Sequence, residues 1–390
     1  MTELEAHDQE SAIRSTEHWK SVPFEQAIEK VLYTNKIRRS EFLDEGAYPV
    51  VSQEEGLING YWNNPADIFK VTQPLTIFGD HTQALKYVDF DFVLGADGVK
   101  ILQPKSFLLP KFFHYQLQGF TLTSLGYARH YRLLKEKQVV YPSLPEQERI
   151  VAILDEVFEG IDKAKANIEN SNSGARLLFE TYLREQFNRL WQSKKIVALA
   201  ELATDIVDGD HMPPPKSSTG VPFVTISNVD KQYHRIDFTD TFFVSREYFD
   251  RLKPNRKPRP GDLLYTVTGS FGIPVKIQDD LEFCFQRHIG LIRPKPHVST
   301  SWLYYLVRSP QLMDQANKGA TGTAQRTVSL SVLRKFRVPE VSLQDQISLA
   351  SDLDTLLLEI ERLEVVQLNK LAALDALRQS VLHQAFSGNL

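Results

Sequence analysis

Cysteine is nearly absent from this chain, because its 390 residues contain only Cys284. A single thiol excludes an internal disulfide and any metal cluster built from several cysteines. No apolar run reaches the roughly 18 residues that would cross a bilayer, and no basic and then apolar N-terminal segment resembles a secretory signal. These absences predict a cytoplasmic protein without a membrane segment.

Sequence motifs of common catalytic chemistry are missing as well. The sequence has no G-x-x-x-x-G-K-[ST] phosphate loop, no G-x-G-x-x-G turn and no H-E-x-x-H metal motif. Asn63-Asn64-Pro65-Ala66 lacks the second proline and the aromatic residue of an adenine methyltransferase signature. Asp208, Asp210 and His211 lie in a loop rich in glycine and proline, which favours a turn over a metal site. We therefore predict a non-catalytic chain without a metal site, although an active site assembled from distant residues stays open.

Two long helices are predicted from apolar periodicity. The first begins near Pro145, where a proline and two early glutamates suit a helix N-terminus, and it runs to about Leu190. Its apolar or small residues alternate in steps of four and three, as in a coiled coil. The expected seam is Ile150, Leu154, Val157, Ile161, Ala164, Ile168, Ser171, Ala175, Leu178 and Tyr182. Poor helix formers at Asn170–Gly174 predict a kink or a local break.

The start of the first helix recurs near the C-terminus. Pro142, Gln147 and Asp155 align with Pro339, Gln344 and Asp352 at one offset of 197 residues. This interval is a whole domain plus a helix, which indicates tandem duplication and not a solenoid. The predicted order is a tail (1–18), a first block (19–144), a long helix (145–192), a second block (193–338) and a second long helix (339–390).

Charge is unevenly distributed along the chain. The formal net charge of −4 conceals a second block with 21 basic and 14 acidic residues, whereas the tail and both helices are net acidic. This segregation favours contact between nucleic acid and the blocks. Short strand-like and helix-like runs are mixed within each block, for example in 48–51, 86–94, 262–268 and 286–293. We therefore expect an α+β fold with two mixed modules and an antiparallel coiled coil, related by a pseudo-twofold repeat.

Several motifs, taken in order, resemble the specificity (S) subunit of a type I restriction-modification system. They include the two Pro-x-x-x-x-Gln helix starts and the closing segment Leu377–Gly388. Gly261–Leu264, Gly269–Gly272 and Gly322–Ser329 in the second block are similar to the family's strand and loop pattern, as are Gly79–Thr82 and Tyr127–Tyr131 in the first. The resemblance covers about residues 19–390, and Ser342-Leu343 departs from the family's Pro-Glu.

The resemblance implies a non-catalytic reader of double-stranded DNA that serves DNA methylation and host defence. Each block would be a target-recognition domain for one half of a bipartite target, and the helix pair would set the spacer. Two modification subunits and two restriction subunits are the implied partners. S-adenosylmethionine, ATP and magnesium are expected on those partners and not on this chain.

Candidate DNA contacts were chosen among polar and basic residues on loops, the residue types that bind base edges and phosphates. They are Gln53, His81, Thr82, Arg129, His130, Arg132 and Lys135 in the first block, and His211, Lys216, Ser217, Thr268, Ser270, Gln325 and Arg326 in the second. The main alternative is a coiled-coil scaffold or adaptor that binds protein partners without reading DNA.

Overall fold

The computed structural model of the chain describes residues 18–390, except positions 97, 125, 127, 213 and 324. The chain divides into two compact units, one made of residues up to Glu169 with Leu368–Leu390, the other of Asn170–Gln367. The predicted tail lies outside the described residues except for His18. Within the described part of the chain, no helix combines the length and the apolar character needed to span a membrane.

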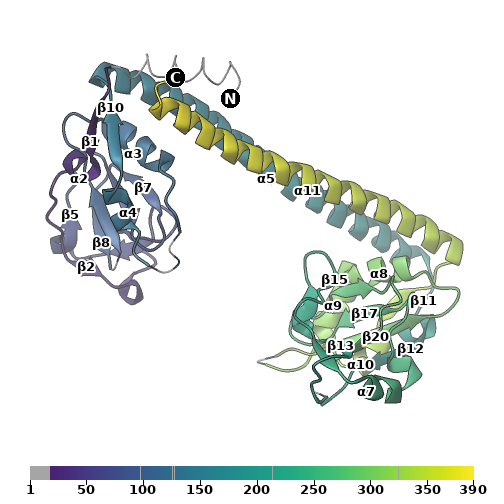
Figure 1. The fold of residues 1–390 in the computed structure, drawn as a ribbon. Helices are drawn as coiled ribbons and strands as arrows, with labels where there is room; N and C mark the ends of the chain where they lie inside the picture. The colour runs from purple at the N-terminus through teal and green to yellow at the C-terminus, as the bar shows by residue number, and fades with distance from the viewer. Residues whose placement is uncertain (1–17, 97, 125, 127, 213, 324) are drawn as a thin grey trace. The chain divides into compact units, whose positions relative to one another are not determined.

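The globular part of the first unit contains, in chain order, β1 (Lys20–Pro23), α2 (Phe24–Ala27), β2 (Lys36–Ile37), η1 (Arg39–Glu41), β3 (Tyr48–Val51), β4 (Gly60–Trp62), η2 (Pro65–Asp67), β5 (Ile68–Phe69), β6 (Leu75–Gly79), β7 (Leu85–Val88), β8 (Phe92–Gly95), β9 (Val99–Leu102), α3 (Pro110–Gly119), α4 (Tyr131–Lys135) and β10 (Gln138–Tyr141). In one sheet β6 pairs antiparallel with β7 and β9. In another, β3 pairs in parallel with β8 and antiparallel with β4. β1 and β10 form a two-stranded sheet next to the long helix (Figure 1).

The globular part of the second unit contains β11 (Ile196–Ala198), α6 (Leu199–Leu202), β12 (Ala203–Asp208), β13 (Val221–Val224), η3 (Ile226–Asn228), β14 (Val229–Asp230), β15 (Arg235–Ile236), β16 (Phe242–Val244), α7 (Arg246–Arg251), η4 (Pro254–Arg256), β17 (Leu263–Thr266), β18 (Pro274–Lys276), β19 (Cys284–Phe285), β20 (Ile289–Pro294), α8 (Thr300–Arg308), α9 (Pro310–Gly319), α10 (Leu330–Arg334) and β21 (Arg337–Pro339). β17 pairs antiparallel with β18 and β20, and β13 pairs in parallel with β19. The same strand arrangement therefore occurs in both units, which confirms the predicted α+β repeat.

Two predicted strands are shorter than expected. The run 86–94 forms β7 and β8, separated by Asp89–Asp91. The Asp91 carboxylate accepts hydrogen bonds from Val71 N at 2.9 Å and Lys70 Nζ at 2.7 Å, so this acidic segment turns toward a preceding loop. The run 286–293 begins as a turn, and the strand β20 starts only at Ile289.

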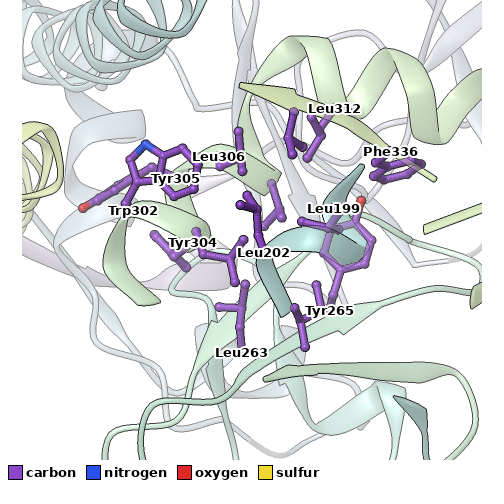
Figure 2. Close-up of a cluster of buried hydrophobic side chains, with 14 of the residues drawn as sticks. Leu199, Leu202, Leu263, Tyr265, Trp302, Tyr304, Tyr305, Leu306, Leu312 and Phe336 are labelled. Atoms are coloured by element: carbon purple, nitrogen blue, oxygen red, sulfur yellow. The ribbon is translucent and has the colours of Figure 1, made fainter. Parts of the chain in front are cut away.

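Side-chain apolarity explains how the second unit is packed. Trp302, Tyr305 and Leu306 on α8 are fully buried and share a cluster with Leu199 and Leu263 (Figure 2). Burying side chains of this size contributes about 1.5–3 kcal/mol each relative to exposure. The cluster continues onto the long helices through Phe179, Leu183 and Phe187 of one and Ala350, Leu353 and Ile360 of the other. The globular part and the helix segments of this unit therefore share one core.

The long helices are α5 (Leu144–Ser193) and α11 (Leu343–Phe386), which lie side by side (Figure 1). α5 is continuous through Asn170–Gly174, so the predicted weak point does not break it. Bonded residues of α5 and of the C-terminal segment have numbers that add to between 538 and 540, which defines an antiparallel register. The pairs are Arg149 with Leu390, Asp162 with Arg378, Lys165 with Asp375, Ser171 with Gln367, Arg176 with Glu364, and Lys194 with Asp345.

The repeat offset of the helices is 199 residues, not the predicted 197. Gln147 accepts a hydrogen bond from Leu109 N at 2.8 Å, and Gln346 accepts one from Ser299 N at 2.8 Å. Each amide Nε2 also donates to the carbonyls of two loop residues, and both side chains are buried. Gln147 therefore corresponds to Gln346, and the alignment with Gln344 was wrong.

A tyrosine–aspartate pair repeats at the same offset. Tyr115 Oη on α3 donates to Asp155 on α5, and Tyr305 Oη on α8 donates to Asp354 on α11 at 2.6 Å. Burial, followed by the hydrogen bond to the carboxylate, raises the pKa of both tyrosines well above the ordinary value. Lys111 Nζ lies 2.8 Å from Asp155. Each globular part is thus fastened to its own helix segment by equivalent polar contacts.

The seam of α5 departs from prediction in its second half. Leu154 and Ile161 are buried as expected, but Leu178 is 62% exposed and Phe179 is 3% exposed in its place. The predicted steps of three and four slip by one residue after Ala175. The large aromatic side chains at Phe179 and Phe187 pack into the core of the second unit, and this packing overrides the apparent heptad.

Candidate nucleic-acid interface

In the first unit, predicted residues meet at the ends of β3 and β6. His81 N donates to Gln53 Oε1 at 3.2 Å, and Thr82 Oγ1 donates to the Gln53 carbonyl. Gly98 in the β8–β9 turn has φ +78°, and a Cβ there would lie 2.3 Å from Gln53 Oε1. We call Gln53, His81, Thr82, Gly98 and His130 the first rim. Only glycine allows the β8–β9 turn to approach the other loops this closely.

Asp80 connects His130 to the rest of the first rim. His130 N donates to the Asp80 carbonyl at 2.8 Å, and Tyr131 N donates to Asp80 Oδ1 at 2.8 Å. Lys100 Nζ lies 3.9 Å from Asp80 Oδ2 and 5.2 Å from the centroid of the Tyr131 ring. Sequence reasoning did not select Asp80 or Lys100, because their role depends on contacts some 50 residues away.

The remaining predicted residues of the first block are arranged differently. Arg129 is exposed beside His130, next to the first rim. Arg132 is exposed on α4. Lys135, at the end of α4, pairs with Glu25 of α2 at 2.7 Å and lies over the Tyr131 ring. Lys135 therefore links two helices, and its charge is already balanced within the unit.

In the second unit, two loops meet at the end of β17. Gly269 N donates to the Arg326 carbonyl at 2.9 Å, and Thr327 Oγ1 donates to Thr268 Oγ1 at 3.3 Å. Ser270 Oγ accepts a hydrogen bond from Lys231 Nζ at 3.0 Å. The structure thus brings together four predicted residues that are 58 positions apart at most. They are Thr268, Ser270, Gln325 and Arg326.

The Arg326 side chain is committed to its own unit. Its guanidinium donates to the Asn317 carbonyl at 2.5 Å and to Asn317 Oδ1 at 3.3 Å, and it lies 5.4 Å from the centroid of the Phe271 ring. These contacts fasten the loop 321–327 to α9. Arg326 therefore positions this loop and presents only part of its hydrogen-bonding capacity to the surface.

A third loop joins this edge through backbone hydrogen bonds. Asp210 N donates to Phe285 O at 3.0 Å, Arg287 N donates to Asp210 O at 3.0 Å, and Val267 N donates to His288 O at 2.9 Å. A Cβ at Gly209 would lie 1.8 Å from Phe285 O, so only glycine fits there. We call Asp210, His211, Thr268, Ser270, Gln286–His288, Gln325 and Arg326 the second rim.

The carboxylates of the second rim are already paired. Asp208 accepts a hydrogen bond from His211 Nε2 at 2.8 Å and from Arg256 Nη2 at 3.2 Å. Asp210 accepts one from Tyr248 Oη and lies 3.8 Å from Arg256 Nη1. No cluster of three or more His, Cys, Asp or Glu suited to a metal occurs among the residues that the structure describes. The two aspartates therefore organise the loop around Arg256.

The remaining predicted residues lie beside the second rim. Lys216 Nζ lies 5.1 Å from the centroid of the Phe242 ring, and that ring stacks on Phe223 at 4.9 Å. Ser217 N donates to Phe243 O at 2.8 Å. Phe223 and Phe242 also line a cavity of about 240 Å³ that borders Asp210 and His211. The seven predicted residues of the second block are thus linked through neighbouring loops.

Each rim offers hydrogen-bond donors and acceptors from several loops at one edge of a folded scaffold. Such groups can bind phosphate oxygens and the edges of bases, while the sheets below hold the loops in place. The first rim is rich in amide, hydroxyl and imidazole groups, whereas the second adds arginine and lysine. The two rims therefore differ in chemistry although their strands are arranged alike.

Comparisons with known proteins follow this geometry. The type I restriction modification DNA specificity domain family matches residues 188–371. The specificity subunit of the type I restriction enzyme EcoBI from Escherichia coli is 21% identical over 364 residues, which are 85% of this chain and 75% of that subunit.

Two solved structures share the fold. One, from work on complex assembly and conformational transition of the type I R-M system, has a TM-score of 0.70 at 19% identity and covers 96% of this chain and 99% of its own. The HsdS subunit from Thermoanaerobacter tengcongensis has a TM-score of 0.53 at 20% identity, covering 96% and 98%.

Proposed function

Because the chain belongs to the specificity-subunit family of type I restriction-modification systems, we propose that it reads a bipartite DNA target with one half-site per unit. The observation that carries this proposal is the repeated strand arrangement with a different polar rim in each copy. A duplicated scaffold suits two equivalent positions on DNA, and unlike rims suit unlike half-sites. A scaffold that binds only proteins would need neither feature.

We further propose that the helix pair sets the length of the spacer between the half-sites. α5 has 50 residues, which at about 1.5 Å each make a helix of roughly 75 Å. Half-sites one DNA turn apart are separated by about 34–36 Å, so this helix is long enough to control such a spacing. The constant antiparallel register supports a fixed and not a sliding helix pair.

The proposed partners are double-stranded DNA, two modification subunits and two restriction subunits. S-adenosylmethionine, ATP and magnesium would act on those subunits, and this chain would be non-catalytic and cytoplasmic. The exposed positions of Arg129 and of residues on the second rim leave both rims accessible to DNA. Phosphate contacts by such residues would make binding weaken as salt rises.

The test is to map methylated adenines in cells that express the modification partner with and without this chain. Loss of methylation at a split sequence without the chain is the expected result. Exchanging residues 193–338 for the matching block of a relative should change one half-site and preserve the other half-site and the spacer. A chain that assembles with its partners and leaves methylation unaltered would instead support the scaffold alternative.

Arg129→Ala provides a narrower test on the first rim. Because Arg129 is exposed, its removal should weaken DNA binding by the assembled complex without affecting folding. Lys163→Ala is a suitable control, since Lys163 is 71% exposed on α5 and pairs only with Glu159 along the same helix. Equal affinities of both variants across a salt titration would contradict the placement of DNA on the first rim.

A further inference from the structure

The turn Gln286–His288 was not among the residues selected from sequence, yet it is the most firmly held loop of the second rim. Gln286 N donates to Val224 O at 3.1 Å, Arg287 N donates to Asp210 O at 3.0 Å, and His288 O accepts from Val267 N at 2.9 Å. The three consecutive residues are thus tied to three different segments. A side chain carried by this turn starts from a fixed backbone, as base reading requires.

Arg287 differs from the other arginines around the second rim in the state of its guanidinium. Arg256 is bonded to Asp208 and Arg326 to Asn317. Arg287 is exposed, and its guanidinium has no hydrogen-bond or ion-pair partner among the residues that the structure describes. The nearby carboxylate of Asp210 already accepts from Tyr248 and faces Arg256. The five N–H donors of Arg287 are therefore available to a ligand.

The surface beside Arg287 is a recess and not a flat wall. Arg287 lines the 240 Å³ cavity together with Gln286 and His288, and its other lining residues include the stacked rings of Phe223 and Phe242. Burial and the neighbouring Arg287 charge lower the pKa of His288, so that its imidazole is neutral near pH 7 and can accept as well as donate. The recess thus combines a cationic fork, an amide and an imidazole over an apolar floor.

A guanidinium on a rigid turn matches one feature of B-DNA closely. Guanine presents two acceptors, O6 and N7, in the major groove, and arginine binds both at once in the commonest specific contact. Phosphate contacts need no such rigidity, because they carry no sequence information. We infer that Arg287 reads a guanine in the half-site of the second unit, an inference that rests on the proposed function.

The experiment compares Arg287→Ala, Arg287→Lys and Arg251→Ala in the complex with the modification subunits. Arg251 is a matched control, because its side chain is 77% exposed on α7 and pairs with Glu247 within the same helix. Binding is measured on the cognate target and on a series in which each base pair of the second half-site is changed in turn. A salt titration accompanies each measurement.

Arg287→Ala should reduce affinity for the cognate target by about 5–150-fold, and the preference for one G·C pair should disappear with it. Arg287→Lys should keep the salt dependence and lose that preference, since lysine lacks the planar fork. Arg251→Ala should retain both. If Arg287→Ala instead weakens all sequences equally and lowers the salt slope by about 0.9, Arg287 contacts phosphate and the inference is wrong.

Failure of the proposed function would look different. In that case the wild-type complex would show no preference for any base pair in the series, and the block exchange would leave the methylated sequence unchanged. A wild-type complex with a clear half-site preference that survives in Arg287→Ala and in Arg287→Lys overturns the inference about Arg287 alone.

Discussion

Lengthening the helix pair should lengthen the spacer of the DNA target, provided that both helices are extended at matched positions. Residues of α5 and α11 that face each other have numbers adding to about 540, so Asn170 lies opposite Lys370. Four residues inserted after Asn170 and four before Lys370 add about 6 Å to each helix. At about 3.4 Å per base step, the preferred spacer should grow by about two base pairs.

The register also predicts what a one-sided insertion does. Four extra residues in α5 alone would shift all later pairs by about 6 Å relative to α11. The ion pairs Lys165–Asp375 and Arg176–Glu364 could then not both form, because they lie on opposite sides of the insertion. The one-sided variant should therefore lose stability or keep its original spacer. A four-residue insertion itself is compatible with a coiled coil, since local unwinding absorbs it.

The assay is adenine methylation mapped in cells that express each variant with the modification partner. Wild type, the one-sided insertion and the matched insertion are compared for half-sites and spacer. Both half-sites should stay unchanged in the matched variant while the number of unspecified base pairs increases. A matched variant that folds, methylates and keeps the original spacer would refute the reasoning that the helices set it.

Three further predictions concern stability. Phe179→Ala should lower the free energy of unfolding by about 3–5 kcal/mol, whereas the exposed Leu178→Ala should change it by less than about 0.5 kcal/mol; chemical denaturation giving similar losses would contradict the observed seam. Gln346→Ala should cost about 1–3 kcal/mol, since it leaves a buried backbone N–H unpaired, while the exposed Gln192→Ala should be neutral in the same assay. Burial and then the charges of two nearby basic residues lower the pKa of His114 to about 4, so its neutral form stabilises the fold above pH 6.5 and this contribution is lost as the pH falls toward 4. His114→Gln should remove about 2–3 kcal/mol of the pH dependence between pH 7 and 4.5, and an unchanged pH profile of unfolding would show that His114 titrates normally.

The helices and the duplication could be predicted because their signals are local or periodic. Proline and glutamate at a helix start, and apolar residues at steps of three and four, act within a few turns of one helix. The offset was missed by two residues because 344–346 contains two glutamines. Only Gln346 reaches back to the loop before α8, and that contact joins residues 47 positions apart. Letter matching favoured the proline pair, whereas the structure follows the buried amide.

The composition of the rims was less predictable, because it depends on which loops the strands bring together. His81 and Gln53 could be selected as polar loop residues, but their mutual hydrogen bond follows from the positions of β3 and β6. Arg287 was missed because alternating apolar residues made 286–293 read as one strand. The turn at Gln286–His288 is set by backbone bonds to segments that lie up to 77 residues earlier.

The excess of basic residues in the second block overstates the charge that the second unit can offer to DNA. Arg293 is buried and bonded to Asp262 at 2.7 Å, where it fastens β20 to the start of β17. Arg246 pairs with Glu282, and Arg308 pairs with Glu180 on α5. These arginines stabilise the fold, and their fields are largely cancelled at the distance of a ligand. Specificity in such a unit therefore depends less on the sum of charges than on which guanidinium groups the fold leaves unpaired on a rigid loop.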